Sequence, residues 1–294
     1  MSAERERTML QADVFEKISN NYYHLTAAEK KVADYVIIHQ RDTQYMSISE
    51  LAEACGVAEA TISRFSKRLG YKGYNAFKLA VANSIASRVA IAGTAVSGEI
   101  LPDDSVADMC QKLLASEIEA LEQTFSLLRP EAVSAAGDLL ERADKVLCMG
   151  QGGSMVIAQD AAHLFSTSFG NYFAISDSHM QAIAAAQMGP RDVLLYVSYS
   201  GATRDLLDIA RLARERRGKT ILITRFPKSP GAALCDVVLQ CGSNESPLQM
   251  GSGAAKIAML FVVDVLFSEM YRRSPEGCRD RRNLTTNALS EKHL

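Results

Sequence analysis

Two stretches rich in glycine and hydroxyl side chains are the residues best suited to hold an anion. Ser198-Tyr199-Ser200-Gly201-Ala202-Thr203 follows the apolar run 193–197 and precedes an amphipathic segment, and Gly150-Gln151-Gly152-Gly153-Ser154 follows another short apolar run. A turn between a strand and a helix N-terminus offers backbone N–H groups, hydroxyl donors and the positive end of a helix dipole. We therefore expect one compact phosphate site, built from the residues Gly152, Ser154, Ser198, Ser200, Gly201 and Thr203.

Other chemistries fit these loops less well. The glycines Gly150 and Gly152 give only a weak dinucleotide fingerprint, since the sixth position of that motif is Met155, and no Gly-Lys-Ser/Thr phosphate loop occurs. The serines have no recognisable His and Asp partners for hydrolysis. The five histidines show no metal-ligand spacing, so neither a metal nor a cofactor is expected.

An isomerase would need an acid or base beside the phosphate. His179 and Glu245 fall in loops at the same predicted end of the sheet, and Ser178 adjoins them. They could move a proton on a sugar phosphate. They could equally bind sugar hydroxyls or point into solvent, and that reading is favoured because lone polar loop residues rarely form a catalytic pair.

A second set of residues, near the N-terminus, could bind DNA. A short predicted helix, 48–54, is followed by Gly56 and by a second helix, 58–69, whose Ile62, Phe65 and Leu69 form a buried stripe. This is the pattern of a helix-turn-helix, with the outer face of the second helix free to enter the major groove. The expected contact residues are Glu59, Ala60, Thr61, Ser63, Arg64, Lys67, Arg68 and Lys72. Arg64 has the reach to contact guanine, and the later cations suit phosphates.

Charge supports this interpretation. Residues 59–90 hold six basic groups and one acid, a local charge of +5 in a chain whose net charge is −2. A basic cluster is the electrostatic footprint of nucleic-acid binding. An ordinary helical hairpin with a solvated charged face remains the alternative.

The elements that position these residues divide into two predicted domains. Helices account for residues 1–88, the Ala- and Gly-rich residues 89–104 form a linker, and alternating strands and helices fill residues 105–273. Such alternation indicates an α/β fold with a five-stranded parallel sheet covered on both faces. If the strand order is 2-1-3-4-5, both glycine- and serine-rich loops flank the crevice where ligands bind. Residues 274–294 are expected to be a polar, loosely ordered tail.

Composition bounds the remaining possibilities. A 48% hydrophobic content supports a real core, and no apolar run is long enough for a membrane-spanning helix. The N-terminus is charged and lacks the apolar centre of a signal peptide. The six cysteines are scattered without a C-x-x-C pair. These features predict a reduced, cytoplasmic protein that has no membrane partner.

Two motif sets, in the expected order, resemble those of one family of regulators. The loops 150–154 and 198–203 resemble the sugar isomerase (SIS) domain, and residues 51–57, 60–65 and 70–74 resemble the helix-turn-helix of RpiR-type regulators. The segments 245–248 and 261–267 resemble the same family. The resemblance implies a bacterial transcriptional regulator of carbohydrate metabolism genes, a non-enzyme that senses a phosphorylated sugar and binds operator DNA as a homodimer or homotetramer.

The resemblance also assigns the sugar phosphate to particular residues, with the phosphate on Ser154, Ser198, Ser200 and Thr203 and the sugar near Ser178, His179 and Glu245. Two positions depart from the family pattern: Ala58 stands where a capping Ser is frequent, and Ala255-Lys256 replaces a frequent Ala/Ser-Arg pair. Two other functions stay open: an aldose–ketose isomerase with an accessory helical domain, and a sugar-phosphate sensor that acts on a protein partner.

Overall fold

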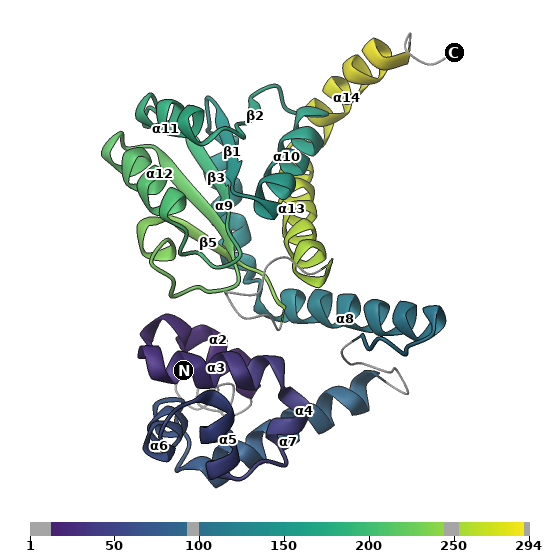
Figure 1. The fold of residues 1–294 in the computed structure, drawn as a ribbon. Coiled ribbons are helices and arrows are strands. Elements are labelled where there is room, and N and C mark those ends of the chain that lie inside the picture. The colour runs from purple at the N-terminus through teal and green to yellow at the C-terminus, as the bar shows by residue number, and fades with distance from the viewer. Residues whose placement is uncertain (1–12, 93–99, 244–252, 291–294) are drawn as a thin grey trace, which may run out of the picture. The chain divides into compact units, whose positions relative to one another are not determined.

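The computed structural model describes residues 13–92, 100–243 and 253–290 of the chain. It divides into two units, Met1–Ser116 with Asn244–Gln249 and Glu117–Ser243 with Met250–Leu294. Helix α8 (Val106–Leu127) crosses this division. The described part of the first unit is helical, and the second unit contains the parallel sheet (Figure 1).

The helices of the first unit follow the capping signals of the sequence. They are α2 (Val14–Asn21), a 3-10 turn (Tyr22–His24), α3 (Ala27–Ile38), α4 (Gln40–Thr43), α5 (Ile48–Cys55), α6 (Glu59–Arg68) and α7 (Tyr74–Ala92). The capping boxes expected at Thr26 and Ser47 are both formed, each with a glutamate at the third helical position. Helix α7 is not anticipated by the sequence analysis, and it extends into the residues assigned to the linker, since alanine favours helix. Linker residues 93–99 lie outside the described residues.

The predicted helix-turn-helix is formed by α5 and α6. Ile62 and Phe65 are fully buried and Leu69 nearly so, which confirms the apolar stripe of α6. Gly56 ends α5 in the left-handed conformation, with φ of 61°, which a glycine adopts without steric cost. The sharp turn between the two helices therefore depends on this glycine.

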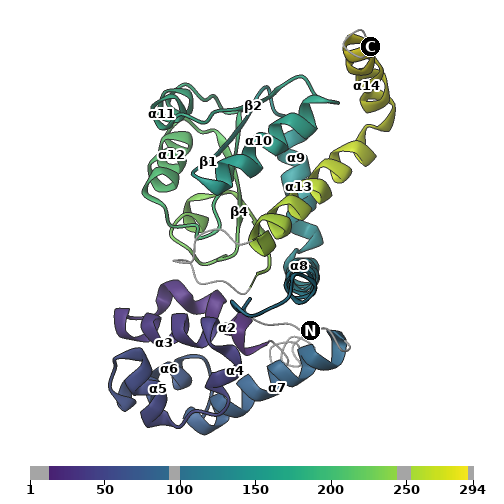
Figure 2. The ribbon, with the colours of Figure 1, turned by 45° about the vertical axis from the view of Figure 1, so that its right-hand side comes forward.

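The second unit is built on a parallel sheet of the expected order, β2-β1-β3-β4-β5 (Figure 2). Its strands are β1 (Val146–Gly150), β2 (Tyr172–Ala174), β3 (Val193–Val197), β4 (Lys219–Thr224) and β5 (Val237–Gln240). Its helices, besides α8, are α9 (Pro130–Glu141), α10 (Gly153–Ser166), α11 (Ser178–Ala186), α12 (Arg204–Glu215), α13 (Gly253–Arg273) and α14 (Pro275–Ser290), with a 3-10 turn at Ala232–Leu234. The predicted fold class is confirmed.

Alternate residues of the central strands enter two separate cores. Val193, Leu195 and Val197 pack with α9, α10 and α13, whereas Leu194 and Tyr196 pack with α11 and α12. All five residues of β1 and of β3 are buried, as expected for strands covered on both faces. This arrangement leaves the carboxyl edge of the sheet for the loops that follow the strands.

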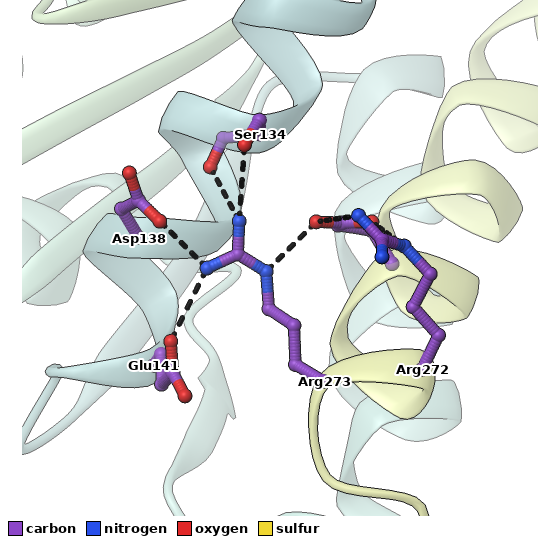
Figure 3. Close-up of polar contacts among 6 residues, drawn as sticks. Ser134, Asp138, Glu141, Arg272 and Arg273 are labelled. Carbon is purple, nitrogen blue, oxygen red and sulfur yellow. Dashed lines mark hydrogen bonds and ion pairs between the residues drawn. The ribbon is translucent and has the colours of Figure 1, made fainter.

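Arg273 fixes α13 to α9. Its guanidinium pairs with Asp138 and Glu141 of α9 and with Glu269 of its own helix, and it donates to the Ser134 carbonyl (Figure 3). A Cβ on Gly137 would lie 2.8 Å from this guanidinium, so the glycine lets the arginine lie against α9. These bonds, the one to Asp138 foremost, raise the pKa of Arg273 above its usual range.

The chain after Arg273 differs from the expectation of a loosely ordered tail, which is wrong for Pro275–Ser290. These residues form α14, although most of them are exposed. The buried Cys278 and a hydrogen bond from Thr285 Oγ1 to the Thr167 carbonyl anchor the helix to the second unit. The polar composition of the segment concealed this helix, since only one of its side chains is buried.

Candidate ligand crevice and recognition helix

The two glycine- and serine-rich loops meet at the carboxyl edge of the sheet. Gly150, the last residue of β1, is in register with Val197, the last residue of β3. These two strands are neighbours, and the strand order reverses between them, so the crevice of a doubly wound sheet falls there. The structure therefore brings together the segments that contain Gly152, Ser154, Ser198, Ser200, Gly201 and Thr203.

The loop after β3 is a tight turn held by its own side chains. Ser198 is buried, and its Oγ accepts a hydrogen bond from the Gly201 N–H. Ser200 Oγ accepts from the Ala202 N–H. Gly201 has φ of 63°, and a Cβ there would collide with Ser229 and lie 2.9 Å from Thr224 Oγ1. The turn is therefore preorganised, and Ser198 supports its shape from within.

Thr203 contributes a hydroxyl that has no partner. It is the N-cap residue of α12, yet its side chain makes no capping hydrogen bond. Its Oγ1 is buried and finds no hydrogen-bond partner in the part of the chain that the structure describes. A buried hydroxyl without a partner costs free energy, so a ligand atom or water at this position would stabilise the loop.

The loop after β1 is more open. Gly152 is exposed with φ of 53°, and a Cβ at this position would meet no atom within 4 Å. A Cβ on Gly150, in contrast, would lie 2.8 Å from the Ser154 carbonyl oxygen, so the loop folds back closely on the end of β1. Ser154 is half-buried in the first turn of α10. Open space beside a helix N-terminus is where an anion can approach.

A buried amide, Gln181, braces the loops around this crevice. Its Nε2 donates to the carbonyl oxygens of Gly150 at 3.1 Å and Ile175 at 2.8 Å, and its Oε1 accepts from Gln151 Nε2 at 2.9 Å. Gln181 has no exposed surface. It therefore ties the loop after β1 to the segment after β2, a role that the sequence analysis missed because the residue lies in an Ala-rich helix without a motif.

Tyr196 lies beneath the same loops. Burial, with a contribution from Asp205, raises the pKa of Tyr196 to about 12, and the neighbouring side chains of Gln151 and Thr203 partly offset this shift. These neighbours nevertheless make no hydrogen bond of acceptable geometry with the hydroxyl, which is buried without a partner in the described residues. Tyr196 is therefore a neutral donor between the two loops.

The residues expected near the sugar are less tightly placed. Ser178 and His179 begin α11 at the same edge of the sheet, and both are exposed. Asp177 caps this helix by accepting from the Met180 N–H. Glu245 lies outside the described residues. The structure thus places Ser178 and His179 at the mouth of the crevice without fixing their side chains on a partner.

The predicted DNA-contact residues fall into three groups. Glu59, Ala60, Arg64, Lys67 and Lys72 are exposed, and Ser63 is half-exposed. Thr61 is buried, so the expectation that it lies on the outer face is wrong. It follows the inward-facing row that includes Phe65, and Arg64 Nη2 donates to its hydroxyl at 3.3 Å.

Arg68 and Glu59 also have partners within their own unit. Arg68 Nε lies 3.0 Å from Oε1 of the buried Glu29 and so ties α6 to α3. Burial opposes ionisation of Glu29, but hydrogen bonds from Thr26 and Arg68 outweigh it and lower the pKa of Glu29. Glu59 Oε1 accepts from Ser49 Oγ at 2.5 Å. Arg64, Lys67 and Lys72 therefore carry most of the cationic surface that is left for DNA.

Two broader expectations can be compared with the described residues. No group of three or more His, Cys, Asp or Glu side chains that could hold a metal ion occurs among them. A search of the same residues finds no helix with the length and hydropathy needed to cross a bilayer.

Comparisons with known proteins agree with this architecture. Residues 12–88 match the helix-turn-helix domain of the rpiR family, and residues 139–269 match the SIS domain. An uncharacterized HTH-type transcriptional regulator of Caldanaerobacter subterraneus is 32% identical over 255 residues, covering 87% of this chain and 89% of that protein. The HTH-type transcriptional regulator HexR of Pseudomonas aeruginosa is 32% identical over 254 residues, covering 86% and 87%.

Solved structures share the fold. The Vibrio vulnificus NanR protein, complexed with ManNAc-6P, superposes with a TM-score of 0.62 at 24% identity and covers 96% of this chain and 100% of that one. The sugar isomerase domain of an RpiR transcription factor from Sphaerobacter thermophilus gives a TM-score of 0.55 at 26% identity, covering 60% and 97%. This chain therefore belongs to the RpiR family of helix-turn-helix transcriptional regulators that carry a SIS domain.

Proposed function

We propose that this regulator binds operator DNA through α6 and senses a phosphorylated sugar in the crevice between the loops after β1 and β3. The observation that carries the proposal is the presence, in one chain, of an exposed cationic recognition helix and a preorganised hydroxyl-lined crevice. The complex of NanR with ManNAc-6P supports a phosphorylated sugar as the effector class.

The crevice fits binding better than turnover. Its hydroxyl and backbone N–H groups suit a phosphate, and Ser178 and His179 at its mouth can contact a sugar. His179 is exposed, and nothing among the described residues orients it as a catalytic base. We infer that the sugar phosphate is an effector that controls genes of carbohydrate metabolism and is not a substrate.

The mechanism is thermodynamic linkage between two sites. An effector that binds one arrangement of the regulator more tightly shifts the population toward that arrangement and changes its affinity for DNA. Recognition of a palindromic operator requires two copies of α6. Ile118 and Phe125 of α8 are exposed, which supports a homodimer or homotetramer as the binding form.

The test is an electrophoretic mobility shift with promoter DNA at several salt concentrations, with and without a panel of sugar phosphates. We expect sequence-specific binding that weakens steeply with salt and responds to at least one sugar phosphate. The Ser200→Ala variant should bind DNA normally but respond to that effector only at higher concentration, since it loses a hydroxyl in the crevice loop.

Three outcomes would contradict the proposal. Failure to bind any DNA specifically would remove the regulator function at the level of α6. Turnover of a sugar phosphate that disappears in a His179→Ala or Glu245→Ala variant would favour an isomerase. Effector binding by a chain that captures a protein partner but no DNA would favour a sensory adaptor.

A further inference from the structure

Arg225 is a buried cation directly behind the crevice loop, and its charge is not neutralised by any described carboxylate. It follows the last residue of β4, and only 1% of its surface is exposed, the largest of the fully buried side chains. The sequence analysis did not single it out. The only sequence signal is its position immediately after a predicted strand, where the chain reaches the same edge of the sheet.

Its contacts hold it against the loop after β3. The Arg225 N–H donates to the Tyr199 carbonyl at 3.1 Å, and Thr224 Oγ1 donates to the same oxygen at 3.0 Å. The Arg225 Nε and the Tyr199 hydroxyl both donate to the Ser243 carbonyl, at 2.9 Å and 3.3 Å. The guanidinium and the crevice loop therefore share one acceptor.

The guanidinium is only partly satisfied. Its Nη1 is buried and has no hydrogen-bond partner, and it forms no ion pair within the ranges that the structure describes. Ser243 Oγ, beside the shared acceptor, is also buried without a partner there. Arginine stays protonated in proteins, so this is a buried positive charge that neutral oxygens alone solvate. Such an arrangement is costly, and it indicates that an anion belongs nearby.

The crevice loops contain no cation of their own. Residues 150–154 and 198–203 include no Lys or Arg. The next basic residue, Arg204, is 95% exposed on its side chain and lies 3.9 Å from Asp208, so solvent and this carboxylate screen it. A charge in the protein interior is screened far less, and its field extends further.

We propose that Arg225 supplies the positive potential that draws a phosphate dianion into the crevice, and so determines its preference for phosphorylated over unphosphorylated sugars. This inference rests on the proposed function of the crevice as a sugar-phosphate site. Arg225 acts through the loop: the phosphate contacts hydroxyl and N–H groups, and the buried charge behind them stabilises the bound anion. Its cost in the unliganded protein is offset when the anion binds.

The experiment compares two variants of the full chain with a matched control. Arg225→Met removes both the charge and the hydrogen bond to Ser243, whereas Arg225→Gln removes the charge and keeps an amide donor. Arg204→Gln removes an exposed cation adjacent to the same loop. Binding of inorganic phosphate, and of whichever sugar phosphates bind the unaltered chain, is measured by calorimetry, and melting temperature is measured without ligand.

We expect both Arg225 variants to bind the phosphorylated ligands at least about 10-fold more weakly, while Arg204→Gln changes binding less than about 2-fold. The melting temperature of the unliganded variants should stay level or rise, since an uncompensated buried charge is removed. The loss of affinity should persist at high salt, where the contributions of exposed charges vanish. A purely structural role would instead lower binding and melting temperature together.

Several results would overturn the inference. Unchanged phosphate binding in both variants would show that the charge does not act on the crevice. Recovery of binding by Arg225→Gln alone would assign the effect to the Ser243 hydrogen bond. A melting temperature that falls by several degrees, or failure of both variants to fold, would show that a partner compensates the charge. If the unaltered chain binds no phosphorylated ligand, the proposed function itself fails.

Discussion

Gly56 and Gly201 have almost the same backbone conformation but very different surroundings. Their φ angles are 61° and 63°. A Cβ on Gly56, in the turn between α5 and α6, would meet no atom within 4 Å, whereas a Cβ on Gly201 would collide with Ser229. The turn of the helix-turn-helix is therefore open, and the crevice loop is closely packed.

This difference reflects what each region recognises. A DNA-binding surface needs exposed cations that reach a large polyanion, so Arg64, Lys67 and Lys72 are exposed to solvent. A phosphate crevice needs donors fixed at short range, so its loop is held by Ser198, Ser229 and Thr224. The first region tolerates added atoms, and the second does not.

The largest expected effect comes from Gly201→Ala. The substitution should cost about 1–2 kcal/mol for the left-handed conformation and roughly 1–3 kcal/mol more for overpacking against Ser229. Gly56→Ala carries the same conformational cost without the collision. Urea unfolding of both variants should therefore show a clearly larger loss for Gly201→Ala, together with weaker sugar-phosphate binding.

A double variant separates these two costs. Ser229→Gly removes the side chain that a Cβ on residue 201 would meet, although it also removes the hydrogen bond from the Ala232 N–H to Ser229 Oγ. A double-mutant cycle corrects for that loss. If Gly201→Ala costs as much with Ser229→Gly as without it, packing does not distinguish the two regions.

The elements that have strong local signals could be predicted from the sequence. The capping residues Thr26 and Ser47, the left-handed Gly56 and the apolar run 193–197 each determine local structure through nearby atoms, and all four are confirmed. The strand order followed from alternating strands and helices, because few parallel topologies satisfy that pattern. The crevice loops were found for the same reason.

What the sequence could not indicate depends on contacts between distant residues. Gln181, Arg225 and Arg273 lie in segments without a motif, and their roles come from carbonyls and carboxylates brought near by the fold. Thr61 was misplaced because one helical residue at the edge of a stripe can face either way, and its burial is decided by packing. Helix α14 was missed because one buried cysteine is too weak a periodic signal.

A smaller effect is expected from Arg64→Ala, which tests whether the open surface reads base sequence. Loss of a bidentate contact to guanine should weaken specific binding by about 1–3 kcal/mol, roughly 10- to 100-fold, and relax specificity at one base pair. Lys67→Ala should instead weaken binding to all sequences and reduce the salt slope by about 1. Fluorescence anisotropy on operator and scrambled duplexes distinguishes the two.

Arg68→Ala is the matched comparison for Arg64→Ala on the same helix. Arg68 pairs with the buried Glu29, so its removal should lower stability more than DNA affinity. An Arg64→Ala variant that binds all duplexes equally weakly would show that Arg64 contacts phosphate and not bases. Equal losses of affinity for Arg64→Ala and Arg68→Ala would show that the intramolecular ion pair does not withhold Arg68 from DNA.

The smallest effect is expected from Ala58→Ser, and here the open surface should accept an added atom with a gain. Ala58 is the N-cap residue of α6 and is exposed, and no side chain caps the helix at this end. A serine Oγ could accept the free N–H of the first turn, which stabilises a helix by roughly 1 kcal/mol. Thermal unfolding and amide hydrogen exchange at the start of α6 measure this gain. Ala54→Ser, at an exposed position inside α5, provides no cap and should leave stability level or slightly lower. Equal effects of the two substitutions would mean that the start of α6 is already fixed by its turn, so that the open space around Gly56 reflects a rigid turn and not a tolerant one.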